Sequence, residues 1–140
     1  MVKLRDAALP VSKERKPAVL VVEDEFVIRT ALSDYLEDCE FVVYDVPNAA
    51  EAVAVLQAEA IPIDAVLTDV RMPGAMDGLG LARWIGENRA GLPVLITTGD
   101  KAATARGLCS ENSILEKPHD LKLVAARIRA AIEAAKRNSA

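Results

Sequence analysis

Short apolar runs alternate with longer helix-like windows along most of this chain, and this alternation restricts the fold more than any other feature. The runs are rich in β-branched residues, as strands buried on both faces of a sheet are. They span Ala18–Val22, Glu40–Val46, Asp64–Thr68, Pro93–Thr98 and Ser113–Leu115. Strict alternation of strands and helices is typical of βα units. We therefore predict an α/β fold, a doubly wound parallel sheet of five strands with five helices.

The windows between these runs predict the helices. Asn48, with Glu51 three residues later, forms an Asn-initiated capping box that predicts the start of the second helix. The others are predicted at Phe26–Glu37, Gly78–Asn88, Lys101–Leu108 and after Asp120. The fourth is the shortest. In the last helix the apolar residues share one face at i, i+3, i+7 and i+11, which favours packing against the sheet; they are Leu121, Val124, Ile128 and Ile132.

Composition restricts the class of protein further. At 140 residues and 51% hydrophobic, the chain fits one domain with a sizeable core. A formal net charge of -4 gives no broad basic surface for nucleic acid or an anionic membrane. Cys39 and Cys109 lack metal-ligand spacing and indicate reduced thiols in the cytoplasm. Residues 1–17 are polar with two prolines and are predicted to form a poorly ordered arm before a domain at residues 18–137.

Polar residues follow the predicted strands at their carboxyl ends, where ligands bind in doubly wound sheets. Glu23 and Asp24 follow the first strand, and Asp69 follows the third. If these strands are neighbours, the carboxylates repel one another unless a cation lies between them. An oxygen-only ligand set without His or Cys favours a hard, partly hydrated ion such as Mg²⁺. Lys117 follows the fifth strand and would pair with a carboxylate or a phosphoryl oxygen.

Four segments, in this order, resemble the receiver domain of two-component response regulators. They are VVED, LTDVRMPG followed by MDG, PVLITTG, and LEKP. The resemblance covers Ala18 to about Ala135, and it implies a flavodoxin-like sheet with strand order 2-1-3-4-5. It also implies a cis peptide bond between Lys117 and Pro118. Because the chain stops soon after its last predicted helix, we expect a stand-alone receiver without an output domain.

The resemblance implies a role for each residue of the acidic edge. Asp69 would be the phosphoacceptor. Asp24 and Asp69 would bind Mg²⁺ directly with the carbonyl of Arg71, and Glu23 would assist through water. Thr98 and Lys117 would hold the phosphoryl oxygens.

The implied function is that of a cytoplasmic signalling protein in a phosphorelay. A sensor histidine kinase or a histidine phosphotransfer protein would donate the phosphoryl group, and phosphorylation would switch the binding of a downstream protein or of a second copy. The chain would catalyse its own phosphorylation and dephosphorylation rather than turn over a substrate. Delivery of a signal, relay of phosphate and a phosphate sink remain open, as does a degenerate receiver that only binds proteins.

Two other classes of protein share parts of this pattern. A flavin carrier has the same topology, but the acids after the first strand would repel its phosphate. A phosphatase with an aspartate nucleophile usually has a second acid two residues later, where this chain has Arg71.

Several positions depart from the usual receiver pattern. Glu23 stands where aspartate is commoner, and Ala75 adds a residue between MPG and MDG. Ile114 occupies the position of an aromatic residue that rotates in many receivers. Only eighteen residues, 99–116, separate Thr98 from Lys117, which predicts a clipped fourth helix.

Overall fold

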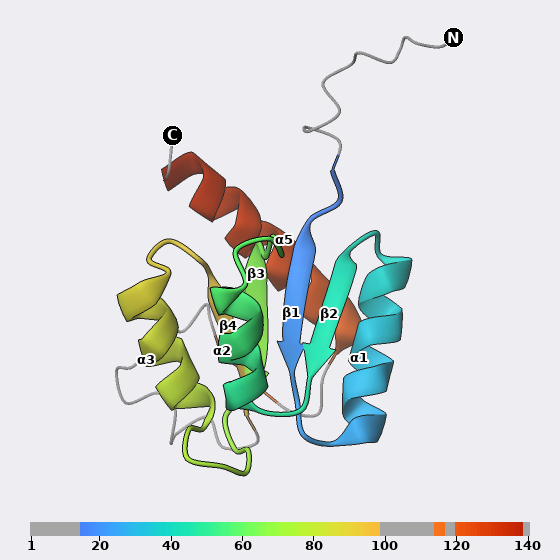
Figure 1. The fold of residues 1–140 in the computed structure, drawn as a ribbon. Helices are drawn as coiled ribbons and strands as arrows, with labels where there is room; N and C mark the ends of the chain where they lie inside the picture. The colour runs from blue at the N-terminus through green and yellow to red at the C-terminus, as the bar shows by residue number, and fades with distance from the viewer. Residues whose placement is uncertain (1–14, 99–113, 117–119, 139–140) are drawn as a thin grey trace, which may run out of the picture.

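The structure of the chain is a computed structural model that describes residues 15–98, 114–116 and 120–138 (Figure 1). Four expectations lie outside the described residues. They concern residues 1–14 of the arm predicted at residues 1–17, the fourth helix at residues 101–108, the side chain of Lys117 and the bond between Lys117 and Pro118. Cys39 is a free thiol, and Cys109 also lies outside the described part of the chain.

The strands form one parallel sheet in the order β2-β1-β3-β4-β5. Their bounds are Ala18–Val22 for β1, Val42–Val46 for β2, Ala65–Asp69 for β3, Val94–Thr98 for β4 and Ile114–Glu116 for β5. All residues of β1 and β3 are buried, because each of these strands has a neighbour on both sides and helices over both faces. The edge strand β2 buries only Val46 fully. The continuous apolar runs of the sequence therefore mark the centre of the sheet.

Helices cover both faces of the sheet (Figure 1). One layer holds α1 (Phe26–Asp38) and α5 (Leu121–Asn138), and the other holds α2 (Ala49–Gln57) and α3 (Gly78–Asn88). Successive side chains of β1 enter different cores, since Val21 packs in the α1 and α5 layer and Leu20 packs in the α2 and α3 layer. This alternation follows from the two-residue period of a strand.

The prediction of five strands and five helices needs a correction. The described residues form four helices, and only four strands reach five residues, in the order β2-β1-β3-β4. β5 has three residues and pairs with β4 alone. Only Ile114 and Leu115 are apolar here and charged residues follow them, so the sequence supports no longer strand. The topology is flavodoxin-like, as predicted.

The boundary between α1 and β2 also differs from the prediction. Glu40 and Phe41 do not belong to the strand but end the helix, where Glu40 N–H donates to the Glu37 carbonyl and Phe41 N–H donates to that of Leu36, both at 3.1 Å. These two bonds form a Schellman motif, with Glu40 in the left-handed region at φ 72°. Phe41 is 2% exposed, so its apolar character serves the core rather than a strand.

This motif gives a stability prediction. A side chain in the left-handed region costs about 1 kcal/mol, which glycine avoids. The ion pair between Lys16 and Glu40, at 3.5 Å, is exposed and adds little. We expect Glu40→Gly to raise the free energy of unfolding in urea by about 0.5–1 kcal/mol.

The matched control is Glu37→Gly, three residues earlier inside α1, which should lower the free energy of unfolding by about 1 kcal/mol. If Glu40→Gly destabilises the protein as much as this control does, the left-handed position does not carry the strain we assign to it.

Candidate functional site

Three carboxylates gather at the carboxyl edge of the sheet. Glu23 and Asp24 follow β1 directly, and Asp69 is the last residue of β3. β1 and β3 are hydrogen-bonded neighbours, with Val22 opposite Thr68, so the two strand ends lie at the same level. One carboxylate oxygen of each residue lies within 4.8 Å of the others. Glu23 is 2% and Asp69 8% exposed, whereas Asp24 is exposed.

The loop between β1 and α1 is held by hydrogen bonds around Glu23. Its N–H donates to the Val46 carbonyl at 3.1 Å, and its carbonyl accepts from Nη1 of Arg29 at 2.8 Å. Its Oε2 accepts from the N–H of Glu25 at 3.1 Å. Glu25 is the N-cap of α1 but makes no side-chain cap bond. The buried Glu23 side chain thus takes over part of the task of ordering the first turn.

The loop between β3 and α3 returns close to the strand that it leaves. Gly78 N–H donates to the Val70 carbonyl at 2.8 Å, and Val70 N–H donates to the Thr97 carbonyl at 3.2 Å. Asp77 caps α3 by accepting from Gly80 N–H at 2.8 Å. A Cβ at Gly78 would lie 1.9 Å from the carbonyl oxygen of Asp69. The absence of a side chain at Gly78 therefore lets α3 begin against the backbone of Asp69.

The other predicted site residues take different places. Thr98 ends β4 and is 5% exposed, one residue beyond Thr97, which pairs with Asp69. Arg71 is exposed and lies two residues after Asp69 in the loop. Lys117 lies outside the described residues. The structure thus gathers Glu23, Asp24 and Asp69 and puts Thr98 on the neighbouring strand.

Two residues at this edge were missed by the sequence reasoning. Arg29 donates to the backbone carbonyl of Glu23. The only feature of the sequence that hinted at this contact is a cation one turn into the helix that follows three acidic residues. Gly78 contacts the backbone of β3, and its signal was the glycine after an N-cap aspartate. Neither signal says which backbone the residue approaches.

The chemistry of the cluster fits a hard divalent cation. Its three ligands are carboxylates, and no histidine or cysteine is among them. Carboxylate oxygens are the ligands that Mg²⁺ prefers. Two of the carboxylates are buried, where mutual repulsion is least screened by water. A bound cation would remove that repulsion, so the residues present fit such an ion.

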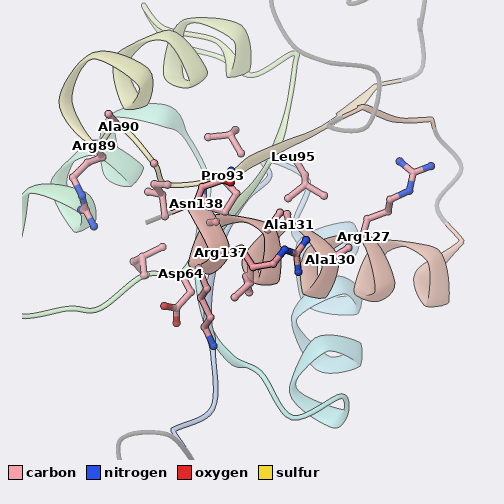
Figure 2. A pocket seen from close by; sticks show the side chains of 18 residues that line it. Asp64, Arg89, Ala90, Pro93, Leu95, Arg127, Ala130, Ala131, Arg137 and Asn138 are labelled. Atoms are coloured by element: carbon pink, nitrogen blue, oxygen red, sulfur yellow. The ribbon is translucent and has the colours of Figure 1, made fainter. Parts of the chain in front are cut away.

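A separate hollow of about 1030 Å³ lies at the opposite edge of the sheet (Figure 2). Asp64 and Pro93, which precede β3 and β4, line it together with the second half of α5. Figure 2 shows Arg89 and Arg137 at this hollow. Because Asp69 ends β3 whereas Asp64 precedes it, the hollow is not part of the acidic cluster.

Comparison with known proteins assigns the chain to a family. Residues 19–129 match the profile of the response regulator receiver domain. The chain therefore belongs to the response regulator receiver family, as its motifs indicated, and is a two-component system protein of that class. The resemblance of the four motifs to this family is confirmed.

Individual relatives support this assignment. The transcriptional regulatory protein ResD of Bacillus subtilis is 32% identical over 124 residues, which are 86% of this chain and 50% of ResD. The C4-dicarboxylate transport transcriptional regulatory protein DctD of Rhizobium meliloti is 40% identical over 83 residues, 59% of this chain and 17% of DctD. The chain thus spans about half, or less, of the length of these curated relatives.

Solved structures give the same answer. A response regulator receiver protein from Sinorhizobium medicae superposes with a TM-score of 0.78 at 26% identity. The superposition covers 87% of this chain and 98% of the Sinorhizobium chain. A receiver domain protein from Clostridium thermocellum superposes with a TM-score of 0.77 at 25% identity, and the superposition covers 86% of this chain and 97% of that one.

None of the described helices has the length and apolar character that a bilayer crossing requires.

The contact of Gly78 with β3 gives a second stability prediction. Its missing side chain faces backbone atoms of Asp69 and Val70, which cannot rotate away. We expect Gly78→Ala to lower the free energy of unfolding by about 1–3 kcal/mol, the range for overpacking. Urea denaturation measures the change.

Gly86 in the same helix is the matched control, because a Cβ there meets nothing within 4 Å. Gly86→Ala should stabilise α3 by up to about 1 kcal/mol. Equal responses of the two variants would contradict the close approach at Gly78.

Proposed function

We propose that this chain is a phosphoacceptor receiver in a phosphorelay and that Asp69 accepts the phosphoryl group. One observation carries the proposal: a buried carboxylate at the end of β3 lies beside two further carboxylates at the edge where parallel sheets bind ligands. The donor is the phosphohistidine of a sensor histidine kinase or of a histidine phosphotransfer protein, and the reaction takes place in the cytoplasm.

The acidic cluster would hold Mg²⁺. Asp24 and Asp69 would hold the ion through their carboxylates, Arg71 would contribute its carbonyl, and Glu23 would assist through water. When bound, the ion neutralises negative charge on the carboxylates and on the phosphoryl oxygens. The exposure of Asp24 leaves this side of the site open to solvent and to the donor.

The chemistry is a displacement at phosphorus. A carboxylate oxygen of Asp69 attacks the phosphorus atom, the P–N bond to the histidine breaks, and its electron pair returns to the imidazole nitrogen. The product is an acyl phosphate. Water later attacks the phosphorus, which releases inorganic phosphate and regenerates the carboxylate. Thr98 and Lys117 donate hydrogen bonds to the phosphoryl oxygens and stabilise their charge.

Thr98 would link the chemistry to the switch. Its hydroxyl is buried at the end of β4, next to the residue that pairs with Asp69. A new phosphoryl group is a strong acceptor, and a hydroxyl that turns toward it favours one of two local arrangements. A downstream protein that binds one arrangement better then reads the phosphorylation state.

The start of α1 lies beside the acidic residues and would face an approaching phosphodonor. Phe26 and Val27 are 69% and 76% exposed and follow the acidic residues directly. Large apolar side chains with this exposure at the rim of a site favour contact with a protein rather than with nucleic acid.

The three clustered carboxylates support phosphate acceptance over a degenerate receiver, which has no need of them.

The phosphoacceptor is tested by removal of its nucleophile. Asp69→Asn keeps the size of the side chain but lacks an attacking carboxylate, so labelling by acetyl phosphate or phosphoramidate in Mg²⁺ should be abolished. Phosphate-affinity electrophoresis or intact-protein mass measures it. Asp34→Asn, an exposed change on α1, is the control and should label normally. Undiminished labelling of Asp69→Asn would defeat the assignment.

The metal site is tested by calorimetry. Asp24→Ala removes one of two direct carboxylate ligands and should weaken Mg²⁺ binding by more than about tenfold and block phosphorylation. The adjacent Glu25→Ala is the matched control, because Glu25 is exposed and does not belong to the cluster. Wild-type affinity in Asp24→Ala refutes its role.

A further inference from the structure

We infer that Arg29 is a positioning residue that sets the Mg²⁺ affinity of the acidic cluster by fixing the peptide between Glu23 and Asp24. The inference rests on the proposed function. Arg29 lies in the first turns of α1, and its side chain is 15% exposed. It has no place among the residues that would touch the ion or the phosphoryl group.

Arg29 joins three elements at the carboxyl edge of the sheet. Nη1 donates to the Glu23 carbonyl at 2.8 Å, and Nε lies 3.4 Å from Oδ1 of Asp45 on β2. The other carboxylate oxygen of Asp45 accepts from Oγ of Ser33 at 2.9 Å. The guanidinium also lies 5.5 Å from the centre of the Phe26 ring. These contacts hold the planar group in one orientation, which a surface arginine would not have.

The bond to the Glu23 carbonyl acts directly on Asp24. The peptide group is planar, so the orientation of the Glu23 carbonyl also sets the N–H and Cα of Asp24. The Glu23 N–H is tied to Val46 on β2, and its carbonyl is tied through Arg29 to Asp45 on the same strand. β2 therefore anchors both sides of Glu23, and the exposed Asp24 carboxylate starts from a fixed backbone.

A simple counterion role for Arg29 predicts the opposite result. A cation beside the acids repels Mg²⁺, so loss of its charge alone should tighten Mg²⁺ binding. Loss of a positioning contact should weaken it, because partners that orient metal ligands contribute about 10–100-fold to affinity. The sign of the change therefore separates the two roles.

The experiment is a Mg²⁺ titration of the folded protein by calorimetry. We expect Arg29→Met to weaken binding at least about tenfold. Arg29→Lys should lose less, since it keeps the charge and one donor nitrogen but lacks the planar fork that reaches both partners. Asp45→Asn removes the charge that Arg29 contacts on β2 and should also weaken Mg²⁺ binding. Unchanged or tighter binding in Arg29→Met overturns the inference.

Arg89→Met is the matched control. Nη1 of Arg89 donates to the Leu56 carbonyl at 2.9 Å, so this change removes the same kind of contact at the opposite edge of the sheet. We expect it to lower the stability of the fold while Mg²⁺ affinity stays at the wild-type value. A loss of affinity in Arg89→Met equal to that in Arg29→Met would mean that general destabilisation explains both, and the inference falls.

A second readout needs no metal. The N–H of Glu25 donates to Oε2 of Glu23, so its hydrogen exchange reports the order of the loop. In metal-free protein this exchange should accelerate in Arg29→Met and not in Arg89→Met. Wild-type protein that binds no Mg²⁺ and takes no label defeats the proposed function together with this inference. Normal wild-type behaviour with unchanged exchange and affinity in Arg29→Met defeats the inference alone.

Discussion

Repulsion between carboxylates at the end of β1 and β3 is the constraint on which the rest of this structure depends. Glu23, Asp24 and Asp69 bring oxygens within 4.8 Å of one another, and two of the three residues are buried. Flexible loops would let these groups move apart. The two strands that carry them are buried along their whole length and are hydrogen-bonded neighbours. The core therefore holds the acids close together, and a bound cation would relieve their repulsion.

The winding of the sheet keeps this site accessible. β1 leads into α1 on one face and β3 leads into α3 on the other, so the two loops leave the sheet in opposite directions. Between neighbouring strands such divergence opens a crevice. Hydrogen bonds to the backbone hold each loop, among them the bond from Arg29 to Glu23 and the bond from Gly78 to Val70. Backbone contacts therefore hold the loops on both sides of the acidic cluster.

The sequence predicted what depends on local pattern and missed what depends on approach between distant segments. The bounds of β1 and α3 are as predicted, because a continuous apolar run and a capped helix are local features. Glu40 was wrongly predicted to begin a strand. A left-handed residue at the end of a helix is usually glycine, so a glutamate at this position does not indicate a helix end. The gathering of the acids followed from strand order alone, whereas the contact of Arg29 with Glu23 needs the course of the loop.

The rigidity of the sheet also restricts how a phosphorylated state could differ from the present one. On the proposed function, phosphorylation converts the single charge of the Asp69 carboxylate into a larger one without moving β3, whose neighbours on both sides are buried strands. The ladder cannot respond without loss of core packing. The response must therefore come from side chains at the strand ends, where Thr98 lies, and from the segments that follow them. The paired strands thus keep the reacting carboxylate fixed for chemistry. The side chains at the strand ends and the segments that follow them can change for signalling.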